Sequence, residues 1–550
     1  MLQAFRLIWQ CDKRAFLLKL CYTVCTSLLP LLNLYVLKLV VDGVADAVTA
    51  RAVDGLVFGQ HLMSRVAIFC GVTLLNRWIG VLNTVNNDVL TQKLTDYVNN
   101  IIQNQSVRLD MAYYDNPEYH DTFHRAQQES AFRPIRILDN LVAVVSALVA
   151  LVGVALMLLV SSWQVVVVML VAVVPSFCVR FYKSRSIYRF RRETTQDMRR
   201  TNYYGQLLTN RVFAKEVRVF GLADHFRNLY VDMRSRLVGR LLAISRRMAF
   251  FDALTAVVEV AALAIVTLIL VRTAVRGAIT LGSFVMLFEA FRRGQGYLSS
   301  LVGGVSGLYE HKLFINNLFE FLDLQPSIVS PATPEPFPER VDEVRFDEVT
   351  FSYPRMHHPT LDHLTFVARR GQLNRIEGEN GYGKTTMLKL LMRLYDPQQG
   401  AVLINGIDIR RFDVAELRRH VSTIFQDYVQ FQFTARENIL FGDIAHAEDA
   451  RRMATALQQS EAENVVGQLR QGLDTPLGRM FDGGEELSMG QWQRIALARQ
   501  LYSDAPILLF DEPTAWMDAD ARAAFSRTVQ SLADDRLVIL VSHVESDKGC

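Results

Sequence analysis

Cysteine is scarce in this sequence, and its cysteines show no pairing pattern. The 550 residues include six cysteines, and no two of them are spaced as a CxxC pair. Most lie inside apolar stretches, so we predict buried, reduced thiols and neither a disulfide framework nor a metal site. The six are Cys11, Cys21, Cys25, Cys70, Cys178 and Cys550.

An excess of charge of one sign is also missing. Lys and Arg number 59 against 56 Asp and Glu, which gives a net charge of +3. Such a balance gives no reason to expect a nucleic acid as partner. We also expect no cleavable signal peptide, because Asp12, Lys13 and Arg14 precede the first apolar run and no small-residue cleavage site follows it.

Charged residues are few, whereas apolar residues are plentiful. They make up 21% and 50% of the chain, and the mean hydropathy is +0.15. The excess lies before residue 310, in runs that reach or approach the length of about 20 residues that a helix needs to cross a bilayer. The clearest run has no charged residue from Leu141 to Val160. We predict six membrane spans, at 16–41, 56–81, 137–160, 163–181, 248–271 and 281–308.

The loops between these spans predict their orientation. The connection between the fourth and fifth spans is rich in basic residues, whereas the first connection is acidic. Basic loops stay on the cytoplasmic side. We therefore predict a multi-pass protein of the plasma (inner) membrane with both termini in the cytoplasm. The basic residues are Lys183, Arg185, Arg189, Arg191, Arg192, Arg199, Arg200, Arg211, Lys215 and Arg218.

The connections after the second and fourth spans are long, and we predict that they continue the spans as helices that project into the cytoplasm. Each contains a segment suited to docking on another domain. One is 113–121, where Pro117 breaks the helix, and the other is 215–226, which is interrupted at Gly221. A plain solvent-facing turn is the alternative for both segments.

A few ionisable residues lie within or near the predicted spans. Charged groups are costly in lipid, so we expect them to face a cavity or each other, with snorkelling near helix ends as the alternative. They do not identify a ligand. The residues are Arg77, Asp252, Glu259, Glu289, Arg292 and Arg293.

The character of the chain changes after residue 320. Five prolines between Pro326 and Pro338 predict a stiff, extended linker. From Val341 onward short β-type runs alternate with helices, which is typical of an α/β nucleotide-binding domain. We therefore predict a helical membrane domain at 1–320, a linker at 321–340 and an α/β domain at 341–550.

The strongest motif is the run GENGYGKTT, which fits the phosphate-loop pattern GxxxxGK[ST]. Its glycines let successive N–H groups face a phosphate, and the helix that follows directs its positive end at the same anion. Lys384 adds a charge on the β- and γ-phosphates of ATP, and the Thr385 hydroxyl can ligate Mg²⁺. The run comprises Gly378, Glu379, Asn380, Gly381, Tyr382, Gly383, Lys384, Thr385 and Thr386.

A second motif supplies two carboxylates. The run ILLFDEP at 507–513 is an apolar strand that ends in Asp511 and Glu512. We predict that Asp511 helps to hold Mg²⁺ and that Glu512 activates the attacking water as general base. The alternative is a strand followed by an ordinary turn with two acidic residues, but the phosphate loop upstream argues against it. The two motifs together predict an ATPase that uses Mg²⁺.

A third stretch, LSMGQ at 487–491 followed by WQRIALAR, resembles the signature of the ABC transporter superfamily, which usually reads LSGGQ. The resemblance covers nearly the whole chain and implies a six-span exporter domain fused to a P-loop ATPase domain. It also implies that Tyr353 stacks on adenine and that Gln426 touches Mg²⁺ and meets the membrane domain. By the same resemblance Asp518 lies in the loop that crosses a dimer interface, and His543 contacts the γ-phosphate.

The resemblance further implies a partner. In this family the signature of one ATPase domain closes over the phosphate loop of another, so Ser488, Gly490 and Gln491 would serve the partner's ATP. The chain would thus be a half-transporter that works as a homodimer, or as a heterodimer with a close relative. The order of its parts is similar to that of bacterial peptide and lantibiotic exporters and implies export of an amphipathic peptide, lipid or drug.

Other functions on the same fold stay open at this point. A nucleotide-gated channel or sensor would not pump, and an importer would move its substrate inward. Lys384, Asp511, Glu512 and His543 are all present, which favours turnover of ATP and hence pumping.

Three features depart from the family pattern. Met489 stands where glycine is usual, so the fit around the partner's triphosphate is expected to differ. The interface loop at 515–518 reads AWMD in place of the common SALD, so we expect altered communication between the two sites. The chain ends seven residues after His543, where the family normally adds a few dozen. We therefore expect a C-terminally shortened ATPase domain with an exposed sheet edge.

Overall fold

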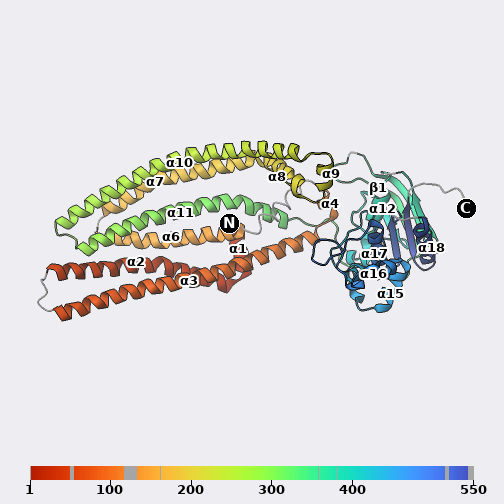
Figure 1. Cartoon of the computed structure of the whole chain (residues 1–550), viewed down its shortest axis with the longest axis horizontal. Coiled ribbons are helices and arrows are strands. Elements are labelled where there is room, and N and C mark those ends of the chain that lie inside the picture. Colours follow the sequence, from red (N-terminus) through yellow and green to blue (C-terminus); the bar gives the residue numbers. More distant parts are fainter. Residues whose placement is uncertain are drawn as a thin grey trace. The chain divides into compact units, whose positions relative to one another are not determined.

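The computed structural model describes residues 2–49, 55–116, 133–161, 163–356, 358–379, 381–514 and 519–542 (Figure 1). It divides into two compact units. The first contains Met1–Ser106 and Thr122–Asp323, and the second contains Val107–Asp121 and Leu324–Cys550. The short stretch Val107–Asp121 therefore belongs to the second unit, although its neighbours in the sequence on both sides belong to the first.

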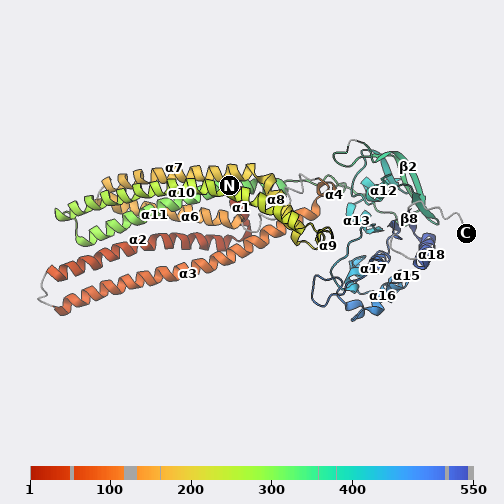
Figure 2. The ribbon, with the colours of Figure 1, turned by 45° about the horizontal axis from the view of Figure 1, so that its top comes forward.

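The first unit consists of helices, several of which are long and run side by side (Figures 1 and 2). Helices α3 and α10 have 54 and 53 residues, far more than a bilayer requires, so they continue beyond the predicted spans as the sequence indicated. Gly221 has φ +63° and separates α9 from α10, which is the predicted interruption. The helices are α1 (Leu2–Cys11), α2 (Lys13–Thr49), α3 (Gly55–Arg108), α6 (Arg133–Ser161), α7 (Trp163–Glu193), α8 (Thr195–Thr209), α9 (Ala214–Val219), α10 (Ala223–Val275) and α11 (Leu281–Leu322).

Five of the described helices are long and apolar enough to cross a membrane, namely α2, α3, α6, α7 and α10. Helix α11 is not among them, because charged residues, glycines and serines interrupt its apolar run. Its charges face each other as expected, since Glu289 lies 3.0 Å from Arg292 and 3.8 Å from Arg293. On the same helix Leu287 and Phe291 are fully buried against neighbouring helices. The sixth span stays a prediction.

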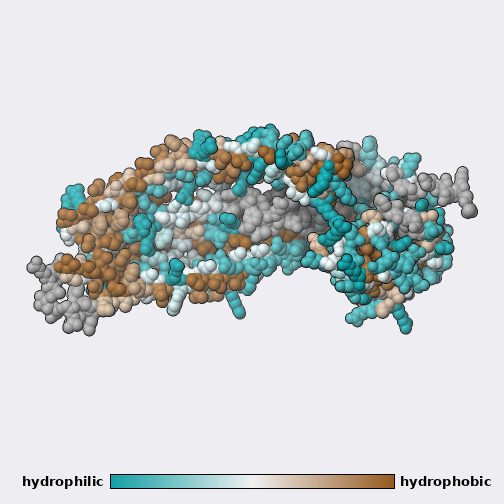
Figure 3. All heavy atoms as spheres, in the orientation of Figure 1, coloured by the Kyte–Doolittle hydropathy of each residue, from teal (hydrophilic) through white to brown (hydrophobic). Residues whose placement is uncertain are grey.

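Much of the apolar surface of the first unit is exposed. Hydrophobic side chains gather over the part of this unit where α7, α10 and α11 run (Figure 3), and α3 exposes Trp78 and Leu82 by more than half. The cysteines follow this pattern. All five described cysteines are free, as predicted, but our expectation of burial is wrong for Cys21, Cys70 and Cys178, which are exposed. They lie on membrane helices, where lipid can cover an apolar thiol.

The second unit is built around two four-stranded sheets. One is antiparallel, in the order β2-β1-β4-β5, and the other is parallel, in the order β3-β8-β7-β6. Parallel strands end at the same edge of a sheet, so the residues after β3 and β7 lie near one another. The strands are β1 (Glu343–Phe351), β2 (Leu361–Arg369), β3 (Leu373–Glu377), β4 (Gln399–Ile404), β5 (Ile407–Asp408), β6 (Val421–Ile424), β7 (Ile507–Asp511) and β8 (Leu537–Ser542).

Helices cover the parallel sheet and complete the core. All five residues of β7 are buried, which explains why this strand reads as a continuous apolar run and not as an alternating one. Helices α12, α17 and α18 contact strands of this sheet, and Trp492 and Tyr502 are the bulkiest fully buried side chains. The helices are α12 (Lys384–Leu391), α13 (Val414–Arg419), α14 (Ala435–Leu440), α15 (Ala450–Gln459), α16 (Ala462–Gln468), α17 (Met489–Tyr502) and α18 (Ala519–Asp535), and the short α4 (Met111–Tyr114) belongs to the same unit.

Residues of the predicted linker form hydrogen bonds and a ring contact with the α/β domain. Ser330 donates to Asp413 over 2.7 Å, and the Glu335 amide donates to the Arg411 carbonyl over 2.9 Å. The ring of Phe337 stacks on His420 with 4.1 Å between centroids. This stretch is therefore part of the surface of the α/β unit and does not act as a free spacer.

Candidate nucleotide-binding site

The phosphate loop connects β3 to α12. It turns at Gly381 and Gly383, which have φ of +89° and +82°, conformations that residues with a side chain rarely adopt. A Cβ at Gly383 would also lie 2.5 Å from a Leu361 methyl carbon and 2.9 Å from the Thr360 carbonyl oxygen. Glycine is therefore required at this position by both conformation and space. Asn380, another predicted member of the loop, lies outside the described residues.

Lys384 is the first residue of α12 and is only 7% exposed. Its ammonium donates to the carbonyl of Gly378, which closes the loop on itself. The same nitrogen lies 3.9 Å from Glu512 Oε1. The predicted phosphate-binding cation and the predicted general base are thus neighbours.

Asp511 ends β7 and is 2% exposed. Its Oδ2 accepts a hydrogen bond of 2.9 Å from the Thr385 hydroxyl, whereas its Oδ1 is buried and has no partner among the residues that the structure describes. Burial raises the pKa of the Asp511 carboxyl, and the bond from Thr385 opposes that rise. An unsatisfied buried carboxylate oxygen is costly, and a hard cation such as Mg²⁺ would satisfy it. The two oxygen donors fit Mg²⁺, which usually takes one or two protein carboxylates together with phosphate oxygens.

Glu512 follows directly and has φ +50°, a left-handed conformation that is uncommon for a residue other than glycine and frequent at functional sites. Its side chain is 11% exposed. Gln426 Nε2 donates to Glu512 Oε2 over 2.7 Å. Four predicted residues from three separate parts of the sequence, Lys384, Gln426, Asp511 and Glu512, therefore meet beyond the carboxyl ends of β3, β6 and β7.

Tyr353 lies close to the same loop. Its hydroxyl is 3.1 Å from the hydroxyl of Thr386, and the ammonium of Lys389 lies 5.4 Å from the centre of its ring. Glu379 and Tyr382 are exposed, Tyr382 by 69%. An aromatic ring beside the phosphate loop suits an adenine base.

The signature residues begin helix α17. Ser488 and Gln491 form a capping box, in which each side chain bonds the other residue's backbone N–H. Gly490 lies in the first turn. In the part of the chain that the structure describes, no hydrogen bond joins these three residues to the phosphate loop. Asp518 and His543 lie outside the described residues, so their predicted roles stay predictions.

Gln493 and Tyr428 also hold the site residues in place, and the sequence did not predict their part in the site. Gln493 is 2% exposed and donates to the carbonyl of Pro513, next to Glu512. Tyr428, two residues after Gln426, donates to the backbone oxygen of Met489 over 2.9 Å. The segment after Gln426 thus touches the signature helix. No local pattern predicts these bonds, because their partners are distant in sequence.

Arg499 fixes the same segment from the far end of α17. Its guanidinium lies 4.7 Å from the centre of the Phe431 ring and donates to Asn438 Oδ1 over 2.8 Å and to the Val429 carbonyl over 3.1 Å. Burial lowers the pKa of Arg499 to about 10. The loop that carries Gln426 is therefore anchored to α17 at both ends of that helix.

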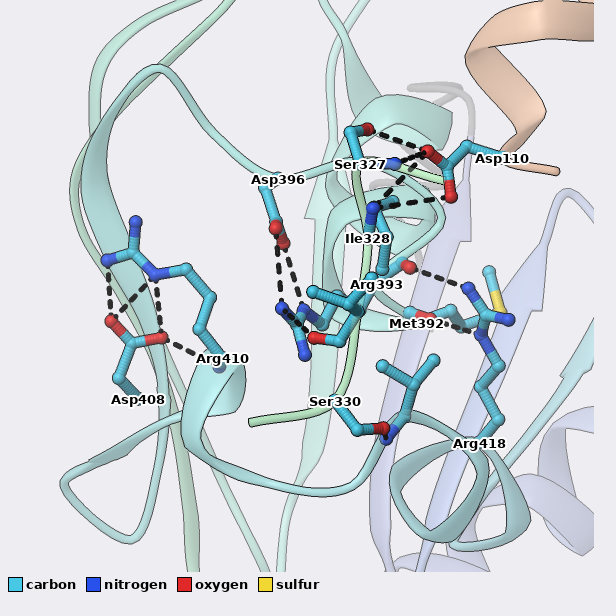
Figure 4. A network of polar contacts seen from close by, with 12 residues as sticks. Asp110, Ser327, Ile328, Ser330, Met392, Arg393, Asp396, Asp408, Arg410 and Arg418 are labelled. Carbon is cyan, nitrogen blue, oxygen red and sulfur yellow. Dashed lines mark hydrogen bonds and ion pairs between the residues drawn. The ribbon is translucent and has the colours of Figure 1, made fainter. Parts of the chain in front are cut away.

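A second polar network binds α4 to the start of the linker residues (Figure 4). The Asp110 carboxylate accepts from the Ser327 amide over 2.5 Å, from the Ser327 hydroxyl over 2.6 Å and from the Ile328 amide over 3.2 Å. The Tyr113 hydroxyl donates to the Gln325 carbonyl over 2.9 Å. The stretch that follows α3 and the chain that leaves α11 are therefore held together.

The same stretch reaches the adenine side of the site. Tyr395 donates a short hydrogen bond to Asp115, and burial together with this bond raises the pKa of Tyr395. Its ring packs against Phe351 and Tyr353, with 5.5 and 5.3 Å between centroids. These contacts join the described part of the predicted docking segment 113–121 to the α/β domain. The remainder of that segment, from Pro117 on, lies outside the described residues.

Asp110→Ala tests this network directly. A hydrogen bond to a charged group is worth about 1.5–3 kcal/mol, so the amides of Ser327 and Ile328 should exchange with deuterium roughly ten- to a hundredfold faster in the variant. Hydrogen exchange with peptide-level mass spectrometry measures this. Asp408→Ala is the control, since Asp408 accepts from Arg410 N over 2.9 Å and should affect only its own turn. Unchanged exchange at 327–328 would contradict the network.

Comparisons with known proteins agree with this site. The family model described as ABC transporter matches residues 361–515, which include the phosphate loop, the signature and Glu512. The subtilin transport ATP-binding protein SpaT of Bacillus subtilis is 27% identical over 98% of this chain and 87% of its own length. Residues 361–515 of this chain therefore form an ABC transporter ATP-binding domain.

Other relatives extend the comparison. The nisin transport ATP-binding protein NisT of Lactococcus lactis is 23% identical over 98% of this chain and 88% of its own length. An ATP-dependent lipid A-core flippase of Vibrio vulnificus is 25% identical over 91% of this chain and 82% of its own length.

A solved structure supports the fold. The structure of a bacterial Atm1-family ABC exporter with ATP bound covers 97% of this chain and 92% of the solved chain, with a TM-score of 0.79 at 22% identity. The chain therefore has the fold of an ABC exporter half-transporter, in which several apolar membrane helices precede, in the sequence, one domain that binds and hydrolyses ATP.

Proposed function

We propose that this half-transporter uses ATP hydrolysis to export an amphipathic peptide across the plasma membrane. The observation that carries the proposal is a single site in which Lys384, Thr385, Asp511, Glu512 and Gln426 meet, in a chain that also has apolar membrane helices. A peptide is favoured over a lipid or a drug because two relatives that each match 98% of the chain are named for transport of subtilin and nisin.

In the proposed mechanism the phosphate loop and Lys384 bind the triphosphate, and Tyr353 stacks on adenine. Thr385 and Asp511 would hold Mg²⁺ with the help of Gln426, and Mg²⁺ would neutralise charge on the β- and γ-phosphate oxygens. Glu512 accepts the proton of the attacking water. His543, for which the support is the sequence alone, would contact the γ-phosphate.

Two chains are needed for a complete site in this proposal. Ser488, Gly490 and Gln491 begin α17, whose N-terminus offers backbone N–H groups to an anion, yet they make no described bond to their own phosphate loop. We infer that they serve the ATP of a second half-transporter, together with Asp518. We further propose that both termini and the long helical extensions lie in the cytoplasm, as the basic loops indicate.

The dimer is a testable part of the proposal. Native mass spectrometry of the protein purified in detergent micelles should show a species of twice the chain mass of 62.4 kDa, and ATPase activity should follow that species on dilution. Activity that stays with a monomer would contradict the composite site. If the purified chain is inactive alone and becomes active with a second, related chain, the dimer is a heterodimer.

A transport assay separates pumping from the alternatives. In proteoliposomes, an amphipathic peptide should raise ATPase activity and accumulate on the side opposite the ATP-binding domains. A channel would let solutes equilibrate and never accumulate. A sensor would bind the peptide without moving it. An importer would give accumulation of the opposite sign.

A further inference from the structure

Within the first unit, α7, α10 and α11 line an open polar cavity of 510 Å³, to which α11 contributes Gly303, Ser306 and Gly307. Ser176, Arg180 and Lys183 line it from α7, and Asp252 and Glu259 line it from α10. Residues three, four and seven apart lie on the same face of a helix. Helices α7 and α10 therefore each contribute one polar face to the cavity, although most of the residues around that face are apolar.

The position of the cavity along the helices explains this polarity. Residues 176–183 lie at the end of the predicted fourth span, 252–259 at the start of the fifth, and 303–307 at the end of the sixth. All three groups thus lie at the same end of the spans, which the proposed orientation places toward the cytoplasm. Polar groups at this depth are costly in lipid, and the fold directs them into a shared cavity.

Two of the charged residues in the cavity neutralise each other. Lys183 lies 3.6 Å from Asp252. Two helical turns away, the Ser176 hydroxyl donates to Glu259 over 2.7 Å. The two contacts are seven residues apart on both helices and run in opposite directions, so they fix the antiparallel register of α7 and α10.

The other two charges have only neutral partners. Arg180 donates to the hydroxyl and the carbonyl of Ser299, over 2.5 and 3.4 Å, and Glu259 accepts from Ser176. Among the residues that the structure describes, neither takes part in an ion pair. A guanidinium has five N–H donors and suits a carboxylate. A carboxylate beside an apolar span favours a cation that neutralises it.

Glycine leaves room beside the arginine. A Cβ placed on Gly303 would lie 3.7 Å from Arg180 Nη1, at ordinary contact distance, so any larger side chain there would enter the space next to the guanidinium. The volume of the cavity falls within the range of about 300–1,000 Å³ that is common for small-ligand pockets. The cavity can therefore hold a short segment of a peptide but not a whole one.

We propose that this cavity is a recognition site for a peptide segment that carries both charges, with a carboxylate of the peptide at Arg180 and an ammonium at Glu259. The proposal rests on the proposed function, because it takes the substrate to be an amphipathic peptide. It adds that the transporter selects peptides of mixed charge. A purely cationic or purely anionic peptide would leave one of the two residues uncompensated.

Binding of three fluorescent peptides to the full-length protein in lipid nanodiscs, without nucleotide, tests the proposal. The first peptide is amphipathic with one lysine and one glutamate, the second has the lysine acetylated, and the third has glutamine in place of glutamate. The first should bind about tenfold more tightly than either of the others, since each charge-assisted hydrogen bond adds to affinity. Arg180→Gln should abolish the preference for glutamate but keep that for lysine, and Glu259→Gln should do the reverse.

Matched controls separate this result from general damage. Arg185→Gln removes an exposed charge from the same helix outside the cavity and should change none of the affinities. Gly303→Leu should weaken all three peptides alike by filling the cavity. If both charge preferences persist in Arg180→Gln and Glu259→Gln, the site is wrong.

Other outcomes distinguish this inference from the proposed function. If all three peptides bind equally to the unchanged protein and stimulate its ATPase, peptide export stands and only the charge selection fails. If no peptide binds or stimulates while ATP is still hydrolysed, the proposed function fails and the inference with it. Lysophosphatidylethanolamine could instead displace the first peptide from the unchanged protein but not from Arg180→Gln. That result would assign the cavity to a zwitterionic lipid headgroup and overturn the proposal.

Discussion

Glu512→Gln should leave ATP binding nearly intact and slow hydrolysis by roughly 10²–10⁴-fold, the usual loss when a general base is removed. Glutamine has the shape of glutamate but cannot accept a proton from water. Its amide oxygen can still accept the hydrogen bond that Gln426 Nε2 makes to Glu512 over 2.7 Å. The variant should therefore keep the local geometry and lose only the chemistry.

Phosphate release under single-turnover conditions, together with the equilibrium binding of a fluorescent ATP analogue, measures both parts of this prediction. Glu463→Gln, an exposed position on α16, makes the same chemical change away from the site and should behave as the unchanged protein does. Near-normal hydrolysis in Glu512→Gln would mean that another group is the base, and His543 is then the next candidate.

The same variant also tests the coupling between nucleotide and dimer. If ATP bridges the phosphate loop of one chain and Ser488 and Gly490 of the other, unhydrolysed ATP should hold the two ATP-binding domains together. The distance between spin labels on the two domains should be shorter with Mg-ATP in Glu512→Gln than in the nucleotide-free protein. An unchanged distance would contradict either the role of the base or the composite site.

Lys384→Ala should abolish measurable hydrolysis and weaken ATP binding. Lys384 is 7% exposed, so its charge acts on the phosphates with little screening by water. Loss of one positioned donor to developing negative charge commonly costs about 10²–10³-fold in rate, and here the donor is a full cation. Without it, Asp511 and Glu512 also face the triphosphate with one positive charge fewer.

Nucleotide binding and steady-state ATPase activity check this second prediction, and a thermal melt shows whether the variant is folded. Arg375→Ala serves as control, because Arg375 is an exposed cation on β3, the strand that leads into the loop. Its removal changes the net charge equally and should leave hydrolysis unchanged. Hydrolysis at the normal rate in Lys384→Ala would overturn the assignment of the phosphate loop.

At the phosphate loop the structure has the features that the sequence motif requires. Gly381 and Gly383 adopt positive φ, and the loop lies between a short strand and a helix. Each feature depends on residues that are close in sequence, so the motif sufficed to predict it. The continuous apolar run of β7 predicted a strand for a similar reason, because a strand that is buried on both faces needs apolar residues at every position.

Predictions that depended on distant partners succeeded less well. The segment 113–121 was predicted to dock, but its contacts with Gln325 and Tyr395 were not foreseen, and neither were those of the nearby Asp110 with Ser327 and Ile328. A carboxylate such as Asp110 has no local pattern that names its partner. The exposure of the membrane cysteines was misjudged because an apolar run does not distinguish a side chain packed on protein from one covered by lipid.

By itself, therefore, the sequence determined the class of the protein, the chemistry of the nucleotide and the presence of membrane helices, because these follow from local conformational demands and from apolar length. Only the tertiary structure decided that Gln426 bonds Glu512, that Asp115 reaches Tyr353 through Tyr395, and that Arg180 and Glu259 share a cavity. Each of these relations joins side chains that are distant along the chain. Packing of whole elements brings them together, and neither composition nor spacing records which elements pack.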